Sequence, residues 1–204
     1  MLDFKKEIRL AFSENKLAIG VSIAILVISL ILGYFLEPYL HAYLNPVVEQ
    51  FSKQIESGAI KLTFQSIFSN NIRIVFLMFL FGLLFCFSTL ILAFNGFFVG
   101  YFTATTGDLF HTLLLLVPHG IFEFSSCILA CSSGIVLFRF AYNLIRTWFG
   151  KENMSLYDSY VLNFDKLKQA IILLMLATVL MAIAGAIEVY LTIPIANFIT
   201  SILS

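Results

Sequence analysis

The sequence predicts an all-α fold, a polytopic membrane helical bundle of about five transmembrane helices with interfacial amphipathic helices, in a single membrane domain over residues 1–204. Hydrophobic residues make up 60% of the chain and charged residues 12%, and the mean hydropathy is +0.98. A soluble domain has roughly 45–50% apolar and about 25% charged residues. The chain therefore has too few charges to cover a soluble globule, and too much apolar surface to remain disordered.

Five apolar runs are each long enough to cross the hydrocarbon core, which takes about 20 residues of helix. They cover residues 17–36, 72–94, 96–117, 118–140 and 170–193. Asn95-Gly96 predicts a tight turn between the second and third runs. A polar stretch that ends at Gly107-Asp108 interrupts the third run. This span is either one helix with a soft centre or two half-helices, with Asp108 as the N-cap of the second.

The distribution of basic residues predicts the orientation of the chain in the cell membrane. Nine lysines and arginines precede the first run or lie at or between the ends of the fourth and fifth, and three lie between the first and second. The positive-inside rule therefore places the N-terminus and residues 141–169 in the cytoplasm, and residues 37–71 and the C-terminus outside. The 12 basic residues balance the 12 acidic ones, so no net charge favours a nucleic-acid partner.

Three segments that flank the runs have amphipathic patterns. Residues 1–16 carry apolar side chains on one helical face and basic ones mostly elsewhere, as expected of a helix at the cytoplasmic headgroup layer. Such a helix is either a plain anchor or a lipid sensor or partner dock. Residues 37–71, with Pro38 and Pro46 as expected breaks, and residues 141–169 predict an external and a cytoplasmic amphipathic segment.

A few ionisable residues lie inside the apolar runs, where each costs at least about 2.5–3.5 kcal/mol at mid-helix. His119 and Glu123 are four apart and share one helical face. Pro118 is expected at the first helical position, which would place Glu123 near a positive helix end. Glu188, near the end of the fifth run, and Arg73, at the start of the second, should reach the same outer depth because the spans alternate in direction.

This cluster leaves three interpretations open. It is a structural network that locks helices together, an ion or proton path, or a metal site with Glu188 as third ligand. No HExxH motif or second nearby histidine supports a metal site, so neither a metal nor a cofactor nor a catalytic set is expected. Gly96 and Gly100 form a GxxxG face, which serves either packing within the chain or a homodimer contact.

The motifs together resemble the stage II sporulation protein M (SpoIIM) family over about residues 65–194. Pro118, His119, Gly120 and Glu123 match its PHGxxE signature. The resemblance also rests on residues 70–73 with Asn71, on Asn95, Gly96 and Gly100, and on Glu188 followed by Pro194. The small residues expected soon after Glu123 are partly replaced by residues 124–127. The resemblance implies work in engulfment of the forespore alongside peptidoglycan hydrolases, or more generally in envelope or membrane organisation, and supplies no enzyme activity.

We therefore expect a non-enzymatic membrane scaffold. The alternative is a small transporter or channel for an ion, a proton or a lipid, built on Glu123, Glu188 and His119; an intramembrane hydrolase is the least favoured. Membrane lipids, a second copy of the chain in a homodimer, and other membrane or envelope proteins are the expected partners.

Overall fold

The computed structural model describes residues 4–57, 63–84, 86–150 and 154–203, and these residues form helices with no strand among them. The helices are α1 Phe4–Ser13, α2 Lys16–Glu56, α3 Phe64–Phe81, the 3-10 turn η1 Gly82–Leu84, α4 Phe87–Thr105, α5 Leu109–Gly150, α6 Leu156–Tyr190 and α7 Thr192–Leu203. The predicted all-α class is confirmed.

Five of the described helical segments are long and apolar enough to cross a membrane, which is the expected number. They are Lys16–Gln50, Phe64–Leu84, Phe87–Thr105, Leu109–Gly150 and Leu156–Tyr190. Their order along the chain keeps the alternation of direction that the sequence predicts, but several of their boundaries differ from the predicted ones.

The predicted second span and its turn are wrong. The apolar run 72–94 contains the end of α3, the turn η1 and the start of α4. Asn95-Gly96 lies inside α4, because Gly96 serves a helix contact rather than a turn. A Cβ at Gly96 would lie 2.4 Å from Ser29 Oγ of α2, so a larger residue would push the two helices apart.

Of the two alternatives for the third run, the structure has the broken one. Helix α4 ends at Thr105, and Gly107 has φ +69°, a conformation that glycine adopts without steric cost. Asp108 Oδ1 accepts a hydrogen bond of 3.0 Å from the backbone N–H of His111, and so caps the first turn of α5.

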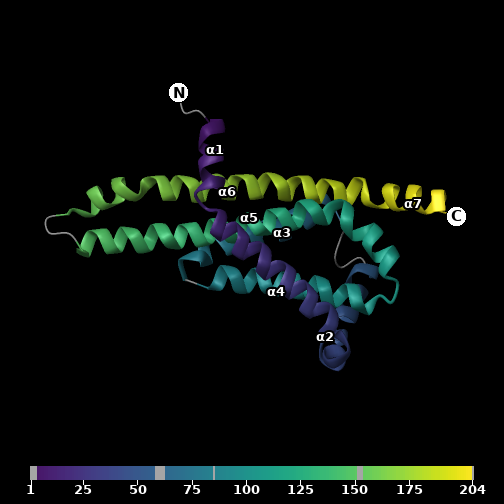
Figure 1. The fold of residues 1–204 in the computed structure, drawn as a ribbon. Coiled ribbons are helices and arrows are strands. Elements are labelled where there is room, and N and C mark those ends of the chain that lie inside the picture. The colour runs from purple at the N-terminus through teal and green to yellow at the C-terminus, as the bar shows by residue number, and fades with distance from the viewer. Residues whose placement is uncertain (1–3, 58–62, 85, 151–153, 204) are drawn as a thin grey trace.

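Pro118 lies inside α5 and not at its start, so that prediction is wrong. The first part of α5, in teal, turns away from the long green part in Figure 1. A bend is expected at an internal proline, which has no N–H to donate. Glu123 lies about four turns from the start of the helix at 3.6 residues per turn, so the helix dipole does not stabilise its charge there.

The flanking segments are also more helical than predicted. Pro38 and Pro46 lie within α2 and do not end it, so the breaks expected at these two prolines are wrong and residues 37–56 continue α2. In the predicted amphipathic segment 141–169, residues 141–150 end α5 and residues 156–169 begin α6; residues 151–153 are outside the described part. The fifth span ends at Tyr190, and α7 continues the chain from Thr192. Helix α1 confirms the expected N-terminal helix from Phe4 onwards.

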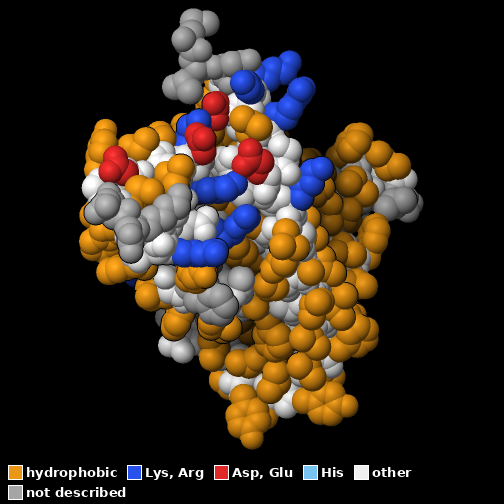
Figure 2. Space-filling model, turned by 60° about the vertical axis from the view of Figure 1, so that its left-hand side comes forward, with side chains coloured by type: hydrophobic (Ala, Val, Ile, Leu, Met, Phe, Trp, Pro, Cys, Tyr) orange, Lys and Arg blue, Asp and Glu red, His pale blue; other side chains and the backbone are white. Residues whose placement is uncertain are grey.

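Helices α5 and α6 are antiparallel and form the most extensive contact in the molecule (Figure 1). Helices α2 and α4 make the second most extensive contact, and α3 packs on both α5 and α6. Helix α1 lies across α6, and the joined ends of α5 and α6 extend beyond it (Figure 1). Figure 2 looks onto this end, where charged side chains gather in the upper part above a mostly hydrophobic surface.

Candidate functional site

The first candidate site is formed by residues of α3, α5, α6 and α7, at the end of the bundle opposite to α1 (Figure 1). We call it the outer polar cluster and define it as Asn71, His119, Glu123, Glu188 and Thr192. Glu123 of α5 is partly buried, and its Oε1 accepts a hydrogen bond of 3.4 Å from Asn71 Nδ2 of α3. Glu188 of α6 lies close enough to Glu123 for their charges to interact.

His119 links α5 to the junction of α6 and α7. Its Nδ1 lies 3.3 Å from Thr192 Oγ1, and the Thr192 hydroxyl donates to the carbonyl oxygen of Ile187 at 3.2 Å. Because that hydroxyl has one proton to donate, His119 Nδ1–H is the donor in the first bond. Thr192 is not among the residues that the sequence predicts for this cluster; its position four residues after Glu188 and two before Pro194 is the signal that could have found it.

Arg73 does not join the outer polar cluster. It lies in the middle of α3 and is exposed, since α3 begins at Phe64 and not at the start of the apolar run. Among the described residues it makes no ion pair with Glu123 or Glu188. Neither Glu123 nor Glu188 therefore has the arginine partner that the sequence predicts, among the described residues.

The remaining sequence candidates serve the packing of the chain. Gly100 is buried against α2, and a Cβ there would lie 2.0 Å from the carbonyl oxygen of Leu30. The GxxxG face of Gly96 and Gly100 thus packs within the chain, and a homodimer would need another surface. Asn95 is half-buried in α4, and Gly120 is buried in α5 one residue after His119.

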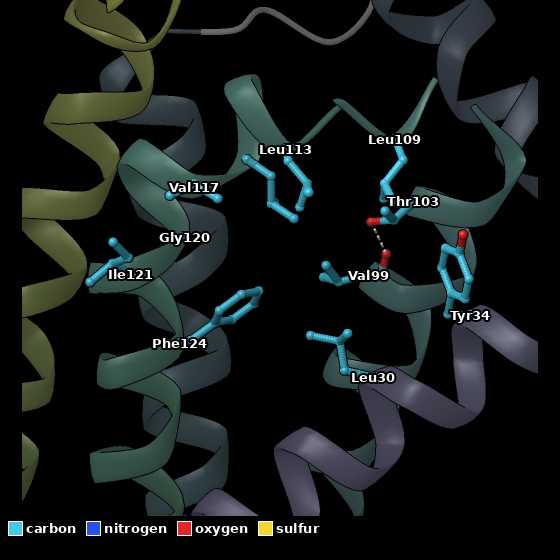
Figure 3. Close-up of a pocket in the computed structure, with 11 residues that line it drawn as sticks. Leu30, Tyr34, Val99, Thr103, Leu109, Leu113, Val117, Gly120, Ile121 and Phe124 are labelled. Carbon is cyan, nitrogen blue, oxygen red and sulfur yellow. Dashed lines mark hydrogen bonds between the residues drawn. The ribbon is translucent and has the colours of Figure 1, made fainter. Parts of the chain in front are cut away.

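A mostly apolar pocket of about 250 Å³ lies between α2, α4 and α5 (Figure 3). Leu30, Val99, Leu113 and Phe124 are among the side chains that line it, and Thr103 in its wall donates its hydroxyl proton to the carbonyl oxygen of Val99. No ionisable residue of the outer polar cluster lines the pocket. Such a lining suits a hydrocarbon chain rather than an ion.

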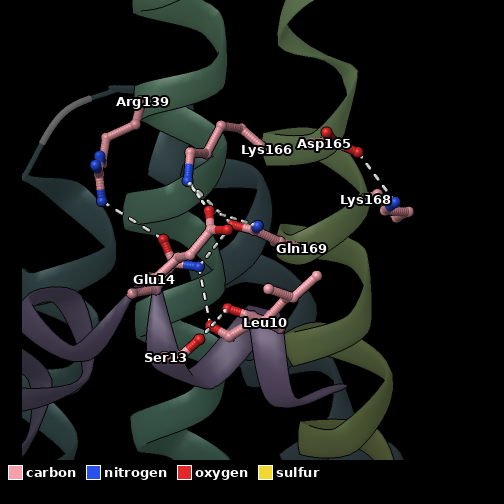
Figure 4. A network of polar contacts seen from close by, with 10 residues as sticks. Leu10, Ser13, Glu14, Arg139, Asp165, Lys166, Lys168 and Gln169 are labelled. Carbon is pink, nitrogen blue, oxygen red and sulfur yellow. Dashed lines mark hydrogen bonds and ion pairs between the residues drawn. The ribbon is translucent and has the colours of Figure 1, made fainter. Parts of the chain in front are cut away.

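A second polar network joins α1 and α2 to α5 and α6, and the sequence did not predict it (Figure 4). Glu14 accepts hydrogen bonds from Lys166 Nζ at 2.7 Å and from Gln169 Nε2 at 2.9 Å. The buried Asn15 donates to Gln169 Oε1 at 2.9 Å and accepts from Arg139 at 3.5 Å. We call these five residues the inner polar network.

The inner polar network stabilises the charged form of Glu14. The hydrogen bonds from Lys166 and Gln169 lower the pKa of the Glu14 carboxyl below its ordinary value. Arg139 lies near the end of the fourth apolar run and is one of the nine basic residues that predict the orientation. The signal that could have revealed the network is the pair of neutral amides, Asn15 and Gln169, next to the starts of the first and fifth apolar runs.

Neither polar group provides a complete metal site. In the described part of the chain, no three His, Cys, Asp or Glu side chains lie close enough together to hold a metal ion. Glu188 therefore does not complete a three-ligand set with His119 and Glu123.

The fold and its internal polar contacts define a multi-pass helical membrane protein. The chain belongs to the stage II sporulation protein M (SpoIIM) family, whose model matches residues 22–193. The resemblance seen in the motifs is thus confirmed, and it extends into the first span.

The chain is similar to two proteins of Methanocaldococcus jannaschii, both described as uncharacterized. Uncharacterized protein MJ0793 is 32% identical over 145 residues, which cover 69% of this chain and 76% of that protein. Uncharacterized protein MJ0706 is 28% identical over 212 aligned residues, which cover 98% of this chain and 92% of that protein. No solved structure matches the chain.

Proposed function

We propose that the chain is a non-enzymatic membrane scaffold that acts in membrane or envelope organisation or remodelling. The observation that carries the proposal is the use of polar side chains inside the bundle. They bond helices to one another, with α5 as the common partner. Membership of the SpoIIM family supports a role in the membrane.

Helix α5 is hydrogen-bonded through side chains to each of the other spanning helices. Asn71 and Thr192 join it to α3 and α7. Ser126 Oγ donates to the Ala177 carbonyl of α6 at 2.7 Å, and Ser132 Oγ donates to Ser22 Oγ of α2 at 3.1 Å. Ser88 Oγ of α4 donates to the Cys131 carbonyl at 3.4 Å. Such bonds hold helices together in lipid, where no hydrophobic effect does so.

The proposed contact region for partners is the end of the α5–α6 hairpin beyond α1 (Figure 1). It exposes the large side chains Trp148, Phe149 and Tyr157, whose exposed fractions are 40%, 75% and 73%. Aromatic side chains of this kind are enriched at membrane interfaces and in the central parts of protein interfaces.

One observation favours the alternative of a small transporter or channel. Glu123 and Glu188 lie within electrostatic reach of each other without an arginine beside them, which is an arrangement that attracts a proton or a cation. His119 on the same face of α5 could take part in a proton relay.

Flux measurements on the full chain in proteoliposomes separate the two functions. The scaffold proposal expects proton and cation flux equal to that of empty liposomes across the pH range. A flux above that level, lost in the Glu123→Gln variant, would support the transporter instead. Glutamine keeps an oxygen that can accept the Asn71 bond and removes only the charge, so a loss of flux would not reflect a broken helix contact.

A double-mutant cycle tests whether Asn71 and Glu123 hold α3 to α5. We expect Asn71→Ala and Glu123→Ala to show a coupling of about 0.6 kcal/mol in the free energy of unfolding, the average for hydrogen bonds between membrane helices. The matched control pairs Asn71→Ala with Ser29→Ala of α2, a helix that α3 does not contact among the described residues. Its coupling should be near zero, and equal coupling in both cycles would contradict the structural role.

A further inference from the structure

A groove of about 600 Å³ follows the elbow where α1 meets α2. Arg9 of α1 and Lys16 of α2 line it, and Phe12, Ile19 and Ile23 form its apolar wall. Lys16 is also the first residue of the first spanning segment, so the groove lies at the level where that helix enters the membrane.

The two described acidic residues of this region, Glu7 and Glu14, do not line the groove. Glu14 pairs with Lys166 at 2.7 Å, and Glu7 pairs with Lys168 at 3.0 Å, and both lysines belong to α6. No acidic residue lines the groove. Among the described residues, neither Arg9 nor Lys16 has an acidic partner, and both are exposed.

The contact with α6 therefore separates the charges of the N-terminal segment into two sets. Among the described residues, the acids Glu7 and Glu14 are bound to α6, while the cations Arg9 and Lys16 lie over an apolar wall that continues along the first turns of α2. A ligand that fits this surface carries a negative charge at one end and hydrocarbon at the other.

We propose that the groove binds one anionic phospholipid from the surrounding leaflet. The Arg9 guanidinium and the Lys16 ammonium bind its phosphate, and its acyl chains lie against Phe12, Ile19 and Ile23. A soluble phosphate would use the two cations and leave the apolar wall uncovered. The site does not depend on the scaffold function, because it uses no residue of the outer polar cluster and no surface of the α5–α6 hairpin end.

Native mass spectrometry of the full chain in detergent tests the proposal by titration with phosphatidylglycerol. We expect one tightly bound lipid in the native chain, and a Kd about 30-fold higher in the double variant Arg9→Gln/Lys16→Gln. That factor is the product of about fivefold for each basic residue near an anionic headgroup. The double variant Lys5→Gln/Arg146→Gln removes the same charge outside the groove and should bind as the native chain does.

Gly20 offers a test of the apolar wall without a change of charge. A Cβ at Gly20 meets nothing within 4 Å, and Gly20 lines the groove, so Gly20→Leu extends an apolar side chain into the space of the acyl chains. This variant should lose the lipid while its thermal unfolding stays at or above that of the native chain. Phosphatidylcholine and glycerol 3-phosphate should not displace phosphatidylglycerol at equal concentration.

Three results would overturn the proposal. Equal weakening by the Lys5/Arg146 pair would show a general charge effect. Native affinity in Arg9→Gln/Lys16→Gln would remove the phosphate site, and displacement by glycerol 3-phosphate would show a site for a soluble anion only.

Discussion

Single residues of the α2–α4 contact decide how closely the two backbones approach. Gly100→Ala would place a Cβ 2.0 Å from the Leu30 carbonyl oxygen, which is backbone and cannot rotate away. We expect a loss of at least about 1–3 kcal/mol in the free energy of unfolding, as for an overpacked core. Gly20→Ala on α2 is the control, because its Cβ meets nothing, and it should be neutral or stabilising. Equal stability of the two variants in detergent would contradict the close approach.

At this scale the sequence predicted which ionisable residues lie inside spans better than it predicted their partners. His119 and Glu123 share one face of α5 because of helical spacing, and the alternation of spans predicts that Glu188 lies at a similar depth. Asn71, and not Arg73, is the residue of α3 that contacts Glu123. The two residues are two positions apart and therefore lie on different faces of the helix. Thr192 could not be predicted, since its contact depends on where α6 ends.

Among the helices, the number of membrane spans is easier to predict from the sequence than the residues at which each span begins and ends. An apolar run gives the length that a membrane requires, but apolar residues continue through the turn at Gly82–Leu84 as they do through a helix. Glycine and proline likewise suggest helix ends where the helix in fact continues. Gly96 is needed for a close helix contact, and Pro118 bends α5 without ending it.

Helix α1 is held to α6 by acidic residues, so its attachment should depend on pH. Hydrogen bonds from Lys166 and Gln169 lower the pKa of Glu14 in the folded chain. A lowered pKa means that the contribution of Glu14 to stability is complete above its ordinary pKa of about 4.5 and is lost as the pH falls through the folded value. We expect the protection factors of the α1 amides, which correct the exchange rates for the intrinsic pH dependence of amide exchange, to fall over that acidic range, while the amides of α5 stay protected.

Two variants separate Glu14 from other carboxylates. Glu14→Gln should expose α1 to faster exchange already at pH 7 and make that exchange less sensitive to acid. Glu49→Gln, which changes an exposed carboxylate paired with Lys53 on α2, should leave the acid dependence of α1 intact. If Glu14→Gln kept the native acid response, the ion pair of Glu7 and Lys168 would be the dominant attachment.

For the whole molecule, the sequence predicted a helical membrane bundle from its composition, and family motifs predicted the family. The sequence could not predict the inner polar network, because its members are separated by up to 155 residues. A neutral amide next to an apolar run is equally consistent with a group exposed to water and with a partner for another helix. Only the packing of α1 across α6 distinguishes the two for Asn15 and Gln169.

The direction of the whole chain in the membrane is the remaining prediction. Five alternating spans place Ser13 and Gly150 on one side and Gln54 and Asn197 on the other, and the basic residues predict that the first side is cytoplasmic. Single cysteines at these four positions, in a chain with Cys86 changed to serine, test this in intact cells with a membrane-impermeant maleimide. The four replaced residues are uncharged, so the substitutions leave the bias of basic residues unchanged.

Cys127 and Cys131 are buried and should not react. Positions 54 and 197 should react in intact cells, and 13 and 150 only after permeabilisation. The reverse pattern would invert the orientation and keep the number of spans, whereas labelling of 13 and 54 from the same side would contradict a single crossing by α2.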